Sequence, residues 1–519
     1  ARLAALREWV EQGGRLVLAL GDDAPRLLAA EAPLGGFVPG QMGESSKLTR
    51  VTALEMFGGA TLPRAAARRA DDEVVAVRLR DVRGRVELFE GDFPLLVRAP
   101  RVFGEVAFSA VDLTRPPLAG WPGRRLFVKR LLSGRAAADE RSDDDETTAS
   151  LPTQLGLVDL SGQLRAALDQ FRGVTLAPFW LVAALAAVYI ALAGPADYFL
   201  LRAMGRRMAL TWITFPLLVA LFCGGAYWAA HRLKGDRLIV NQVDLVDIDV
   251  TSGRSRGTTW FNIFTPATTS YDLSVSPAPR DAAAAQVLLS WQGLPGGALG
   301  GMEQAMAAPA SVARGYELSP DRAELRGVPI PVWATKSFVA RWRMPAAADI
   351  DARLRFGADR VAEGSLTSRH EGPLTDCLLI TGRWAWQIGE LKPGQTVPIV
   401  AGDQRDLQAL LKDFKLVKER GKNTLVEVST PYNPAGFDVP SIIRQMMFYD
   451  ANSGRRYTGL LNRYQHDLDL SNHLALGQAV LWAAAEEPAS EVRENGRRLS
   501  GPDDQHWTFY RYLLPVGRE

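Results

Sequence analysis

Two adjacent carboxylates, Asp22 and Asp23, are the side chains of this sequence best placed to do chemistry. They follow the apolar run at residues 15–20 and the turn residue Gly21. A carboxylate held at such a turn can act as a nucleophile or a general base. The competing interpretation is structural, because Asp is a preferred helix N-cap and Pro25 suits the first turn of a helix. We favour the structural interpretation and assign no catalytic residue.

The sequence also offers possible metal ligands. Asp247 and Asp249 are two residues apart on an expected strand, close to Asp244, and carboxylate oxygens are ligands for Ca²⁺. The dense loop D-x-[DN]-x-[DN]-G of a calcium site is absent, so we predict a solvated strand face. The pair His370-Glu371 lacks the second histidine of H-E-x-x-H. The other histidines are scattered: His231, His466, His473 and His506. We therefore predict neither a metal site nor a cofactor.

The elements around Asp22 and Asp23 form an α/β unit. Residues 3–10 carry apolar side chains at helical spacing, Gly13-Gly14 stops that helix, and residues 15–20 read as a buried strand. In open α/β sheets, ligands bind beyond the carboxyl ends of the strands. A site in this unit would therefore lie at Asp22 and Asp23.

The spacing L..WV..GG.LVL..G over residues 6–21 resembles class I glutamine-amidotransferase-like (flavodoxin-like) domains, and residues 104–121 resemble the closing segment of such a domain. The resemblance implies an α/β domain at residues 1–133. Active members carry a nucleophilic Cys at the turn where this chain has Gly21-Asp22-Asp23, which implies a non-catalytic domain. Because Ala1 is neither an initiator Met nor part of a signal-like pattern, we expect the domain to be incomplete at its N-terminus.

Within this region, residues 74–80 and 85–90 read as a hairpin around the turn at 81–84, and residues 95–98 and 102–111 as a second pair of strands. Residues 121–132 are expected to form the last helix. Residues 40–47 lack the spacing of a phosphate-binding loop and are interpreted as a surface loop.

Residues 178–230 are predicted to form a transmembrane helical hairpin. Residues 179–192 and 208–230 contain no charged side chain, and about 20 apolar residues span a bilayer. The short segment between the two runs is basic: Arg202, Arg206 and Arg207. By the positive-inside rule this turn is cytoplasmic and both flanking regions are extracytoplasmic. Basic residues beyond the second helix argue the other way: Arg232, Lys234 and Arg237.

Aromatic side chains mark the two ends of the hairpin, as is typical of membrane interfaces. Trp180, Tyr227 and Trp228 fall at one end, and Tyr198 and Trp212 at the other.

Asp197 lies close to the basic turn. An ionisable residue in a membrane segment is a functional candidate, but Arg202 or water could satisfy it, and we favour that structural interpretation. Gly194-Pro195 is expected to kink or end the first helix.

The remaining chain divides by composition. Residues 134–158 are acidic and predicted to be a flexible linker, and residues 159–177 an amphipathic helix that either lies on the bilayer or packs on the chain's own soluble part. Beyond the hairpin the period changes to two. It predicts a β-sandwich-like domain at 236–345 and a second β-rich domain with helical insertions at 346–519.

A net charge of +2, from 60 Lys and Arg against 58 Asp and Glu, gives no global field for nucleic acid. Residues 194–202, 210–214, 240–243 and 256–260 resemble a family of uncharacterised bacterial membrane proteins. That family combines an amidotransferase-like domain, a two-helix hairpin and a C-terminal β-rich region. The resemblance implies a multidomain protein of the bacterial inner (cytoplasmic) membrane.

We therefore expect a non-catalytic, membrane-anchored extracytoplasmic scaffold or binding protein of the cell envelope. Its partners would be the lipid bilayer and envelope or membrane proteins. The alternative is an envelope hydrolase or amidotransferase-like enzyme that uses Asp22 and Asp23. A transporter accessory subunit is a weaker third hypothesis.

Overall fold

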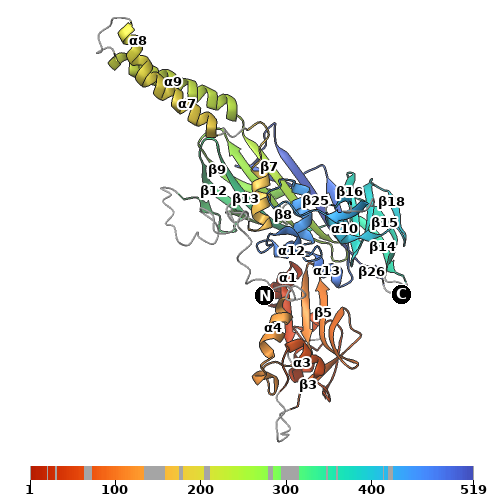
Figure 1. The fold of residues 1–519 in the computed structure, drawn as a ribbon. Helices are drawn as coiled ribbons and strands as arrows, with labels where there is room; N and C mark the ends of the chain where they lie inside the picture. The colour runs from red at the N-terminus through yellow and green to blue at the C-terminus, as the bar shows by residue number, and fades with distance from the viewer. Residues whose placement is uncertain are drawn as a thin grey trace.

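The computed structural model describes residues 2–19, 21–29, 32–62, 73–133, 158–174, 179–203, 211–278, 285–293, 315–346, 349–357, 361–412, 414–418 and 425–517. It shows a mixed α/β protein rich in β-sheet with two long apolar helices, which confirms this coarse part of the predicted fold class. Three parts follow one another in space (Figure 1). They are the N-terminal region (2–133), the β-rich body (158–174 and 235–517), and the hairpin (179–234) at the far end from the N-terminal region.

The N-terminal region is built on a sheet of order β1-β6-β5-β4, in which β1 and β6 run parallel. Helices and a separate strand pair, β2 and β3, surround it. The elements are α1 (Arg2–Glu11), β1 (Arg15–Ala19), η1 (Gly21–Asp23), α2 (Ala24–Leu27), η2 (Gly35–Phe37), β2 (Gln41–Lys47), α3 (Thr52–Gly58), β3 (Val75–Arg80), β4 (Arg85–Glu90), β5 (Phe93–Arg101), β6 (Gly104–Ser109), η4 (Leu118–Gly120) and α4 (Arg124–Ser133).

Two predictions for this region are wrong. The strands expected at 74–80 and 85–90 exist, but β3 pairs with β2 and β4 pairs with β5, so they do not form a hairpin. The loop expected at 40–47 is strand β2. Its side chains are mostly exposed, because β2 pairs on one side only, and it therefore lacks the apolar alternation that reveals a half-buried strand.

The β-rich body is centred on one sheet that has nine strands in the described residues, of order β10-β13-β8-β7-β25-β22-β16-β17-β19. We call it the central sheet. Its strands are β7 (Ile239–Asp249), β8 (Arg254–Thr265), β10 (Gln286–Trp291), β13 (Ala334–Pro345), β16 (Leu374–Thr381), β17 (Trp384–Leu391), β19 (Arg405–Asp406), β22 (Ala479–Ala485) and β25 (Gln505–Leu514).

Two smaller sheets pack against one face of the central sheet. The lateral sheet, of order β11-β12-β9-β23-β24, covers one half, and the distal sheet, of order β18-β15-β14-β26, covers the other. Their strands are β9 (Thr269–Pro277), β11 (Glu317–Leu318), β12 (Glu324–Ile330), β14 (Ile350–Phe356), β15 (Ala362–Ser368), β18 (Thr396–Ile399), β23 (Ser490–Glu494), β24 (Arg497–Arg498) and β26 (Val516–Gly517).

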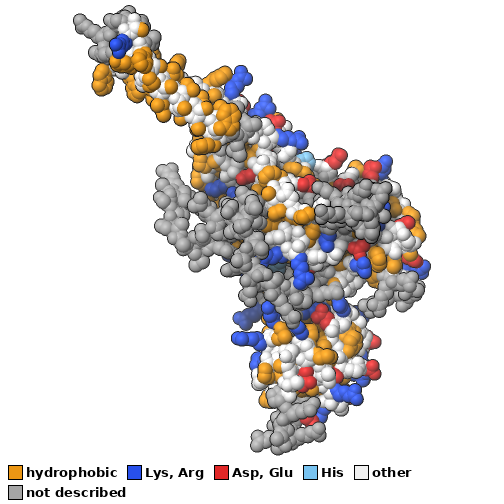
Figure 2. Space-filling model, in the orientation of Figure 1, with side chains coloured by type: hydrophobic (Ala, Val, Ile, Leu, Met, Phe, Trp, Pro, Cys, Tyr) orange, Lys and Arg blue, Asp and Glu red, His pale blue; other side chains and the backbone are white. Residues whose placement is uncertain are grey.

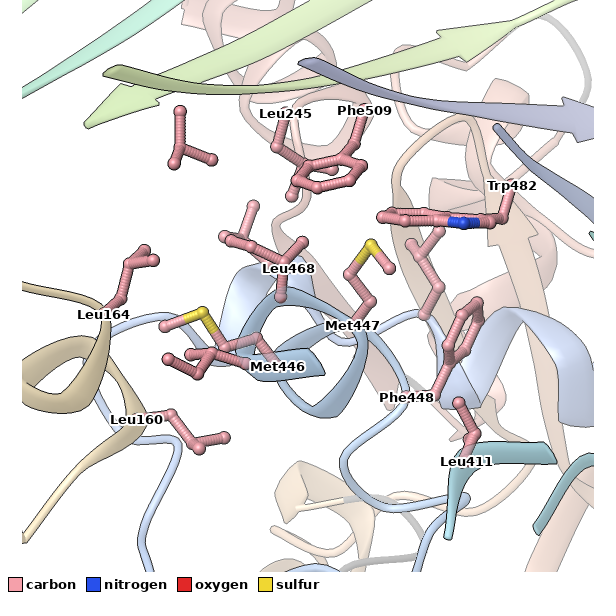
Figure 3. Packing of buried hydrophobic residues seen from close by; sticks show 14 of the residues in the cluster. Leu160, Leu164, Leu245, Leu411, Met446, Met447, Phe448, Leu468, Trp482 and Phe509 are labelled. Carbon is pink, nitrogen blue, oxygen red and sulfur yellow. The ribbon is translucent and has the colours of Figure 1, made fainter. Parts of the chain in front are cut away.

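Helices cover the opposite face of the central sheet. In Figure 3, Leu245, Phe509 and Trp482 project from strands toward Met447 of α11. The elements on this side or between strands are α6 (Leu160–Leu168), α10 (Leu407–Leu411), α11 (Val439–Met447), α12 (Arg455–Thr458), η10 (His466–Leu468), α13 (Ser471–Ala475) and the separate pair β20 (Phe414–Lys418) and β21 (Leu425–Ser429). Alternate side chains of β7 point to opposite faces of the central sheet, and Val243 and Leu245 are on the face that contacts the helices.

Helix α6 belongs to the body and does not lie on a bilayer. Leu160, Leu164 and Leu168 are buried in the same cluster as α11. Its N-cap Asp159 is buried, accepts a hydrogen bond from the Ser161 amide, and accepts another from the amide of Arg463. The choice that the amphipathic pattern left open is therefore settled in favour of packing on the chain's own soluble part.

The predicted boundary near residue 345 passes through one sheet. The central sheet takes β7, β8, β10 and β13 from one side of that position and β16, β17, β19, β22 and β25 from the other. The last long strand, β25, pairs in parallel with β7, the first strand after the hairpin. The two predicted β-rich segments thus share a core.

The hairpin consists of α7 (Phe179–Ala191), a π-helical turn η7 (Leu192–Ala196), α8 (Asp197–Ala203) and α9 (Thr211–Lys234). Pro195 therefore widens one helical turn and the helix continues beyond it. Among the described residues, two helices are long and apolar enough to cross a membrane: Phe179–Ala203, with mean hydropathy 2.0, and Thr211–Ala229, with mean hydropathy 1.5. Figure 2 shows their surface covered with hydrophobic side chains.

Candidate functional site

The turn after β1 positions Asp23 for an ion pair. Gly21 has φ +48°, and a Cβ there would lie 2.6 Å from the Asp112 Cβ, so the tight turn requires glycine. Asp23 stands at the N-cap of α2, but its side chain accepts no capping hydrogen bond. Its carboxylate instead pairs with Arg115 at 2.7 Å. The predicted capping role is wrong for Asp23; the side chain of Asp22 lies outside the described residues.

The membrane-segment candidates lie at the far end of the hairpin. Asp197 begins α8 and is buried within the hairpin, while Arg202 is exposed one turn further on. Arg206 and Arg207 lie outside the described residues. Trp180, Tyr227 and Trp228 are exposed at the body end, and Tyr198 and Trp212 are exposed near the tip. This is the two-ended aromatic distribution that the sequence predicted.

The acidic run on β7 is buried, so the predicted solvated face is wrong. Asp244, Asp247 and Asp249 are 0%, 1% and 6% exposed. The described residues contain no group of three or more His, Cys, Asp or Glu side chains that could hold a metal ion. Both faces of β7 are covered, and the three carboxylates are instead satisfied by protein groups.

Asp247 lies between two arginines on the flanking strands. Arg256 of β8 and Arg511 of β25 are its direct cross-strand partners. Arg256 Nε donates to Asp247 Oδ2 at 2.7 Å, and Arg511 Nη2 donates to the same oxygen at 2.8 Å. Burial raises the pKa of Asp247, but Arg511 and Arg256 more than offset it, and the pKa lies below its ordinary value. The carboxylate is thus held ionised between two cations.

Arg256 also connects the two soluble parts. Arg256 Nη1 donates to the Gln12 carbonyl of the N-terminal region at 2.8 Å, and Arg256 Nη2 donates to the Asp467 carbonyl at 2.9 Å. The Arg256 guanidinium also lies 4.8 Å from the Phe103 ring centroid. One buried charge cluster therefore joins the N-terminal region to the β-rich body.

Phe103 is the main apolar contact of this junction. It occupies the β5–β6 turn and is buried in the cluster beneath the central sheet instead of in the core of its own region. Its carbonyl lies 3.1 Å from the Nε2 atom of His473 on α13. Glu11 adds an ion pair to Arg254 of β8. These contacts couple the N-terminal region mechanically to the body.

Asp469 lies close to this junction and should make the folding stability of the protein depend on pH. Burial raises its pKa to about 7, with a further contribution from the charge of Asp450. A carboxyl of the unfolded chain titrates near 4, so between about pH 4 and pH 7 the folded protein binds the extra proton. Stability therefore falls as pH rises through this window.

The variant Asp450→Asn should reduce this loss of stability at higher pH, because it removes the neighbouring charge and lowers the pKa of Asp469. We expect the fall in melting temperature between pH 5 and pH 8 to shrink, since each pKa unit is worth about 1.4 kcal/mol. Differential scanning fluorimetry at both pH values measures it. Asp351→Asn, at a half-buried carboxylate outside this region, is the control, and equal pH profiles for the wild type and Asp450→Asn would contradict the assignment.

A cleft of about 420 Å³ opens on the face of the central sheet that carries the two smaller sheets. Its floor comes from β7, β13 and β25, with Val246, Ile248, Trp342 and Tyr510. Its walls include Pro345, Ala346 and Asp349, the segments 370–373 and 485–489, and Ala278. The cleft thus lies where the lateral and distal sheets meet.

Polar groups under and around the cleft are firmly held. Asp244 accepts hydrogen bonds from Thr259 Oγ1 at 2.6 Å and Ser490 Oγ at 2.7 Å, and burial raises its pKa. Trp342 Nε1 donates to Thr259 Oγ1 at 3.1 Å. Burial also raises the pKa of Tyr510, as do nearby carboxylates, so its hydroxyl stays protonated at neutral pH. A buried hydrogen-bond network around Asp244 and Thr259 thus lies beneath the floor.

Sequence reasoning missed this cleft and did not connect His370 with it. The ring of His370 lies 5.2 Å from that of Tyr510, 140 positions later in the chain. The one local signal was the acidic pair Glu486-Glu487 directly after an apolar run, which was not singled out. The N-terminal candidates Asp22 and Asp23 belong to a different part of the molecule.

Comparisons with known proteins give little functional information. Residues 349–511 match the model of a domain of unknown function (DUF8725), which covers less than half of the chain. No curated protein matches. Among solved structures, the chain is similar to the "Yeast delta-COP-I mu-homology domain complexed with Dsl1 WxWxV peptide", at 8% identity, 54% coverage of this chain and 98% of that chain, and a TM-score of 0.23. A likeness this low carries no argument.

Proposed function

We propose that this protein is a non-catalytic, membrane-anchored scaffold or binding protein of the bacterial cell envelope. The hairpin would be its anchor in the cytoplasmic membrane, and the N-terminal region and β-rich body would both be extracytoplasmic. The N-terminal region would be an amidotransferase-like domain of flavodoxin-like type without catalytic function, and the body a β-sandwich. Envelope or membrane proteins would be its partners.

The observation that carries this proposal is the exposure of the hairpin. None of the side chains in the most apolar windows of its two helices is buried, although their mean hydropathies are 2.0 and 1.5. At 1.5 Å per residue, the 25 residues from Phe179 to Ala203 extend about 38 Å, and the hydrocarbon core of a bilayer is about 30 Å thick. Lipid is the environment that such a surface fits.

The hairpin also constrains where the soluble parts lie. Helices α7 and α9 both meet the body at the same end, and α8 lies at the opposite end of the hairpin (Figure 1). If the hairpin crosses a bilayer, both soluble parts therefore lie on one side of it. The buried cluster of Asp247, Arg256 and Arg511 supports a scaffold role, because it holds those parts together.

The binding role is supported by the cleft, and no comparable feature among the described residues supports the enzyme alternative. A ligand pocket is typically a concavity of about 300 to 1,000 Å³ that is largely preformed. The carboxylate of Asp23, by contrast, is engaged by Arg115 and is close to half exposed. An ion-paired carboxylate at such a position is a weak nucleophile or base.

Cysteine labelling in spheroplasts tests the topology. In a background with Cys223→Ser and Cys377→Ala, single cysteines are introduced by Met56→Cys, Glu390→Cys or Arg206→Cys. Met56 and Glu390 are exposed, in the N-terminal region and the body. A membrane-impermeant maleimide should label the first two variants directly and Arg206→Cys only after permeabilisation.

The reverse labelling pattern would show that the topology is inverted. Extraction of the protein from membranes by alkaline carbonate would show that the hairpin is not an integral anchor. Labelling of the cysteine-free background is the control for non-specific reaction.

A further inference from the structure

The charges around the cleft all have one sign. Four carboxylates line it, from three different segments: Asp349, Glu371, Glu486 and Glu487. Among the described residues that line it, none is Lys or Arg. Glu371, Glu486 and Glu487 are exposed at its rim, where they can meet a charged ligand. Clefts lined by one sign of charge concentrate ligands of the opposite sign.

The floor of the cleft adds aromatic and apolar surface. Trp342 and Tyr510 lie in it beside Val246 and Met344, and the wall residue His370 packs its ring against that of Tyr510. Aromatic faces attract cations, and Trp and Tyr are the side chains that do so best. A bare metal ion would gain nothing from an apolar floor. An ammonium or guanidinium group on an apolar stem can contact both the carboxylates and the apolar floor.

The cleft is also placed for a ligand in solution. Strand β7 begins five residues after α9 ends, and Val246 lies seven residues further along it. At about 3.3 Å per residue, the cleft is roughly 23 Å from the end of the strand next to the hairpin. It therefore lies beyond the interfacial region of a bilayer that the hairpin spans.

We propose that this cleft is a binding site for an organic cation, an ammonium or guanidinium group carried on an apolar stem. The carboxylates at the rim pair with the charge, and Trp342 and Tyr510 contact the stem. The inference rests on the proposed function as a binding protein and gives that function its ligand class. The cation is either a free polyamine or a basic side chain of a partner protein.

Isothermal titration calorimetry on the full chain in detergent micelles tests this inference. The two probes are spermidine and a hexapeptide of alternating lysine and alanine. Saturable binding of spermidine identifies a free amine as the source, and binding of the peptide alone identifies a basic protein segment. A hexapeptide with glutamate in place of lysine should not bind.

Variants locate the binding. The double variant Glu486→Gln and Glu487→Gln should lower the affinity for the amine probe about ten-fold or more, because it removes two attractive charges while keeping side chains of similar size. The matched control is Glu317→Gln together with Glu390→Gln, which removes two exposed carboxylates outside the cleft and should leave the affinity unchanged. Near-ultraviolet circular dichroism checks that each variant is folded.

If neither amine probe binds saturably, the inference is wrong. It is also wrong if the two pairs of substitutions lower the affinity equally. The micelle assay does not depend on topology. An inverted labelling pattern in spheroplasts with intact amine binding would therefore reject the cellular placement alone, and correct labelling without binding would reject the ligand class alone.

Discussion

Replacing Asp247 by Ala is expected to lower the free energy of unfolding by about 3 to 5 kcal/mol, the usual cost of removing one member of a buried ion pair. The reason is that Arg511 is completely buried and Arg256 nearly so, and both point their guanidinium groups at this carboxylate. Without it, two positive charges face each other inside the protein. Because the pKa of Asp247 is lowered, its stabilising contribution is present at neutral pH and is lost as the pH falls below the ordinary carboxyl pKa and through the lowered one.

Thermal unfolding of the full chain in micelles measures this loss. The matched control is Asp351→Ala, which breaks an Asp–Arg pair with Arg369 at 3.0 Å on the surface and should cost less than about 1 kcal/mol. Because Arg256 also holds the Gln12 carbonyl, Asp247→Ala should in addition increase hydrogen exchange at residues 8–14. Equal melting temperatures for the two variants would contradict the central role of Asp247.

The second large effect is expected for Phe103→Ala, at about 3 to 5 kcal/mol. The ring is 3% exposed and fills the cluster of the body from a turn of the N-terminal region. Its loss leaves a cavity between the two parts and removes the contact of Arg256 with an aromatic face. We therefore expect both a lower melting temperature and weaker coupling of the N-terminal region to the body.

The control variant Phe37→Ala separates the loss of stability from the loss of coupling between the two parts. Phe37 is 4% exposed, but it packs only within the core of the N-terminal region. Hydrogen exchange followed by mass spectrometry should show increased exchange in α13 for Phe103→Ala and no change there for Phe37→Ala. If α13 responds equally to both, Phe103 does not couple the two parts.

Much of the secondary structure was predictable because its signals are local. A continuous apolar run marks β22, a run rich in aromatic residues marks β25, and the helical stripe at Ile442, Ile443, Met446 and Met447 marks α11. Strand pairing was not predictable from adjacent residues. Strand β3 pairs with β2 across a segment of 27 residues, from 48 to 74, and only the packed region decides between that partner and β4.

The carboxylates of β7 show why burial was misjudged. Asp residues on a strand usually indicate a solvated face, and the side chains that neutralise Asp247 come from β8 and from β25, 264 positions away. Asp244 is likewise satisfied by Ser490. A sequence shows the charge of these side chains but not the partners that make their burial possible.

The sequence by itself determined the two apolar helices, the basic composition of the segment between them and the change to β-structure after residue 236, because each of these depends on consecutive residues. The tertiary structure decided the burial of Asp247, the junction at Phe103 and the cleft. All three bring together segments more than 100 residues apart. The physical reason is that a site of this kind is defined by which strands become neighbours, and that choice is made by packing of the whole core.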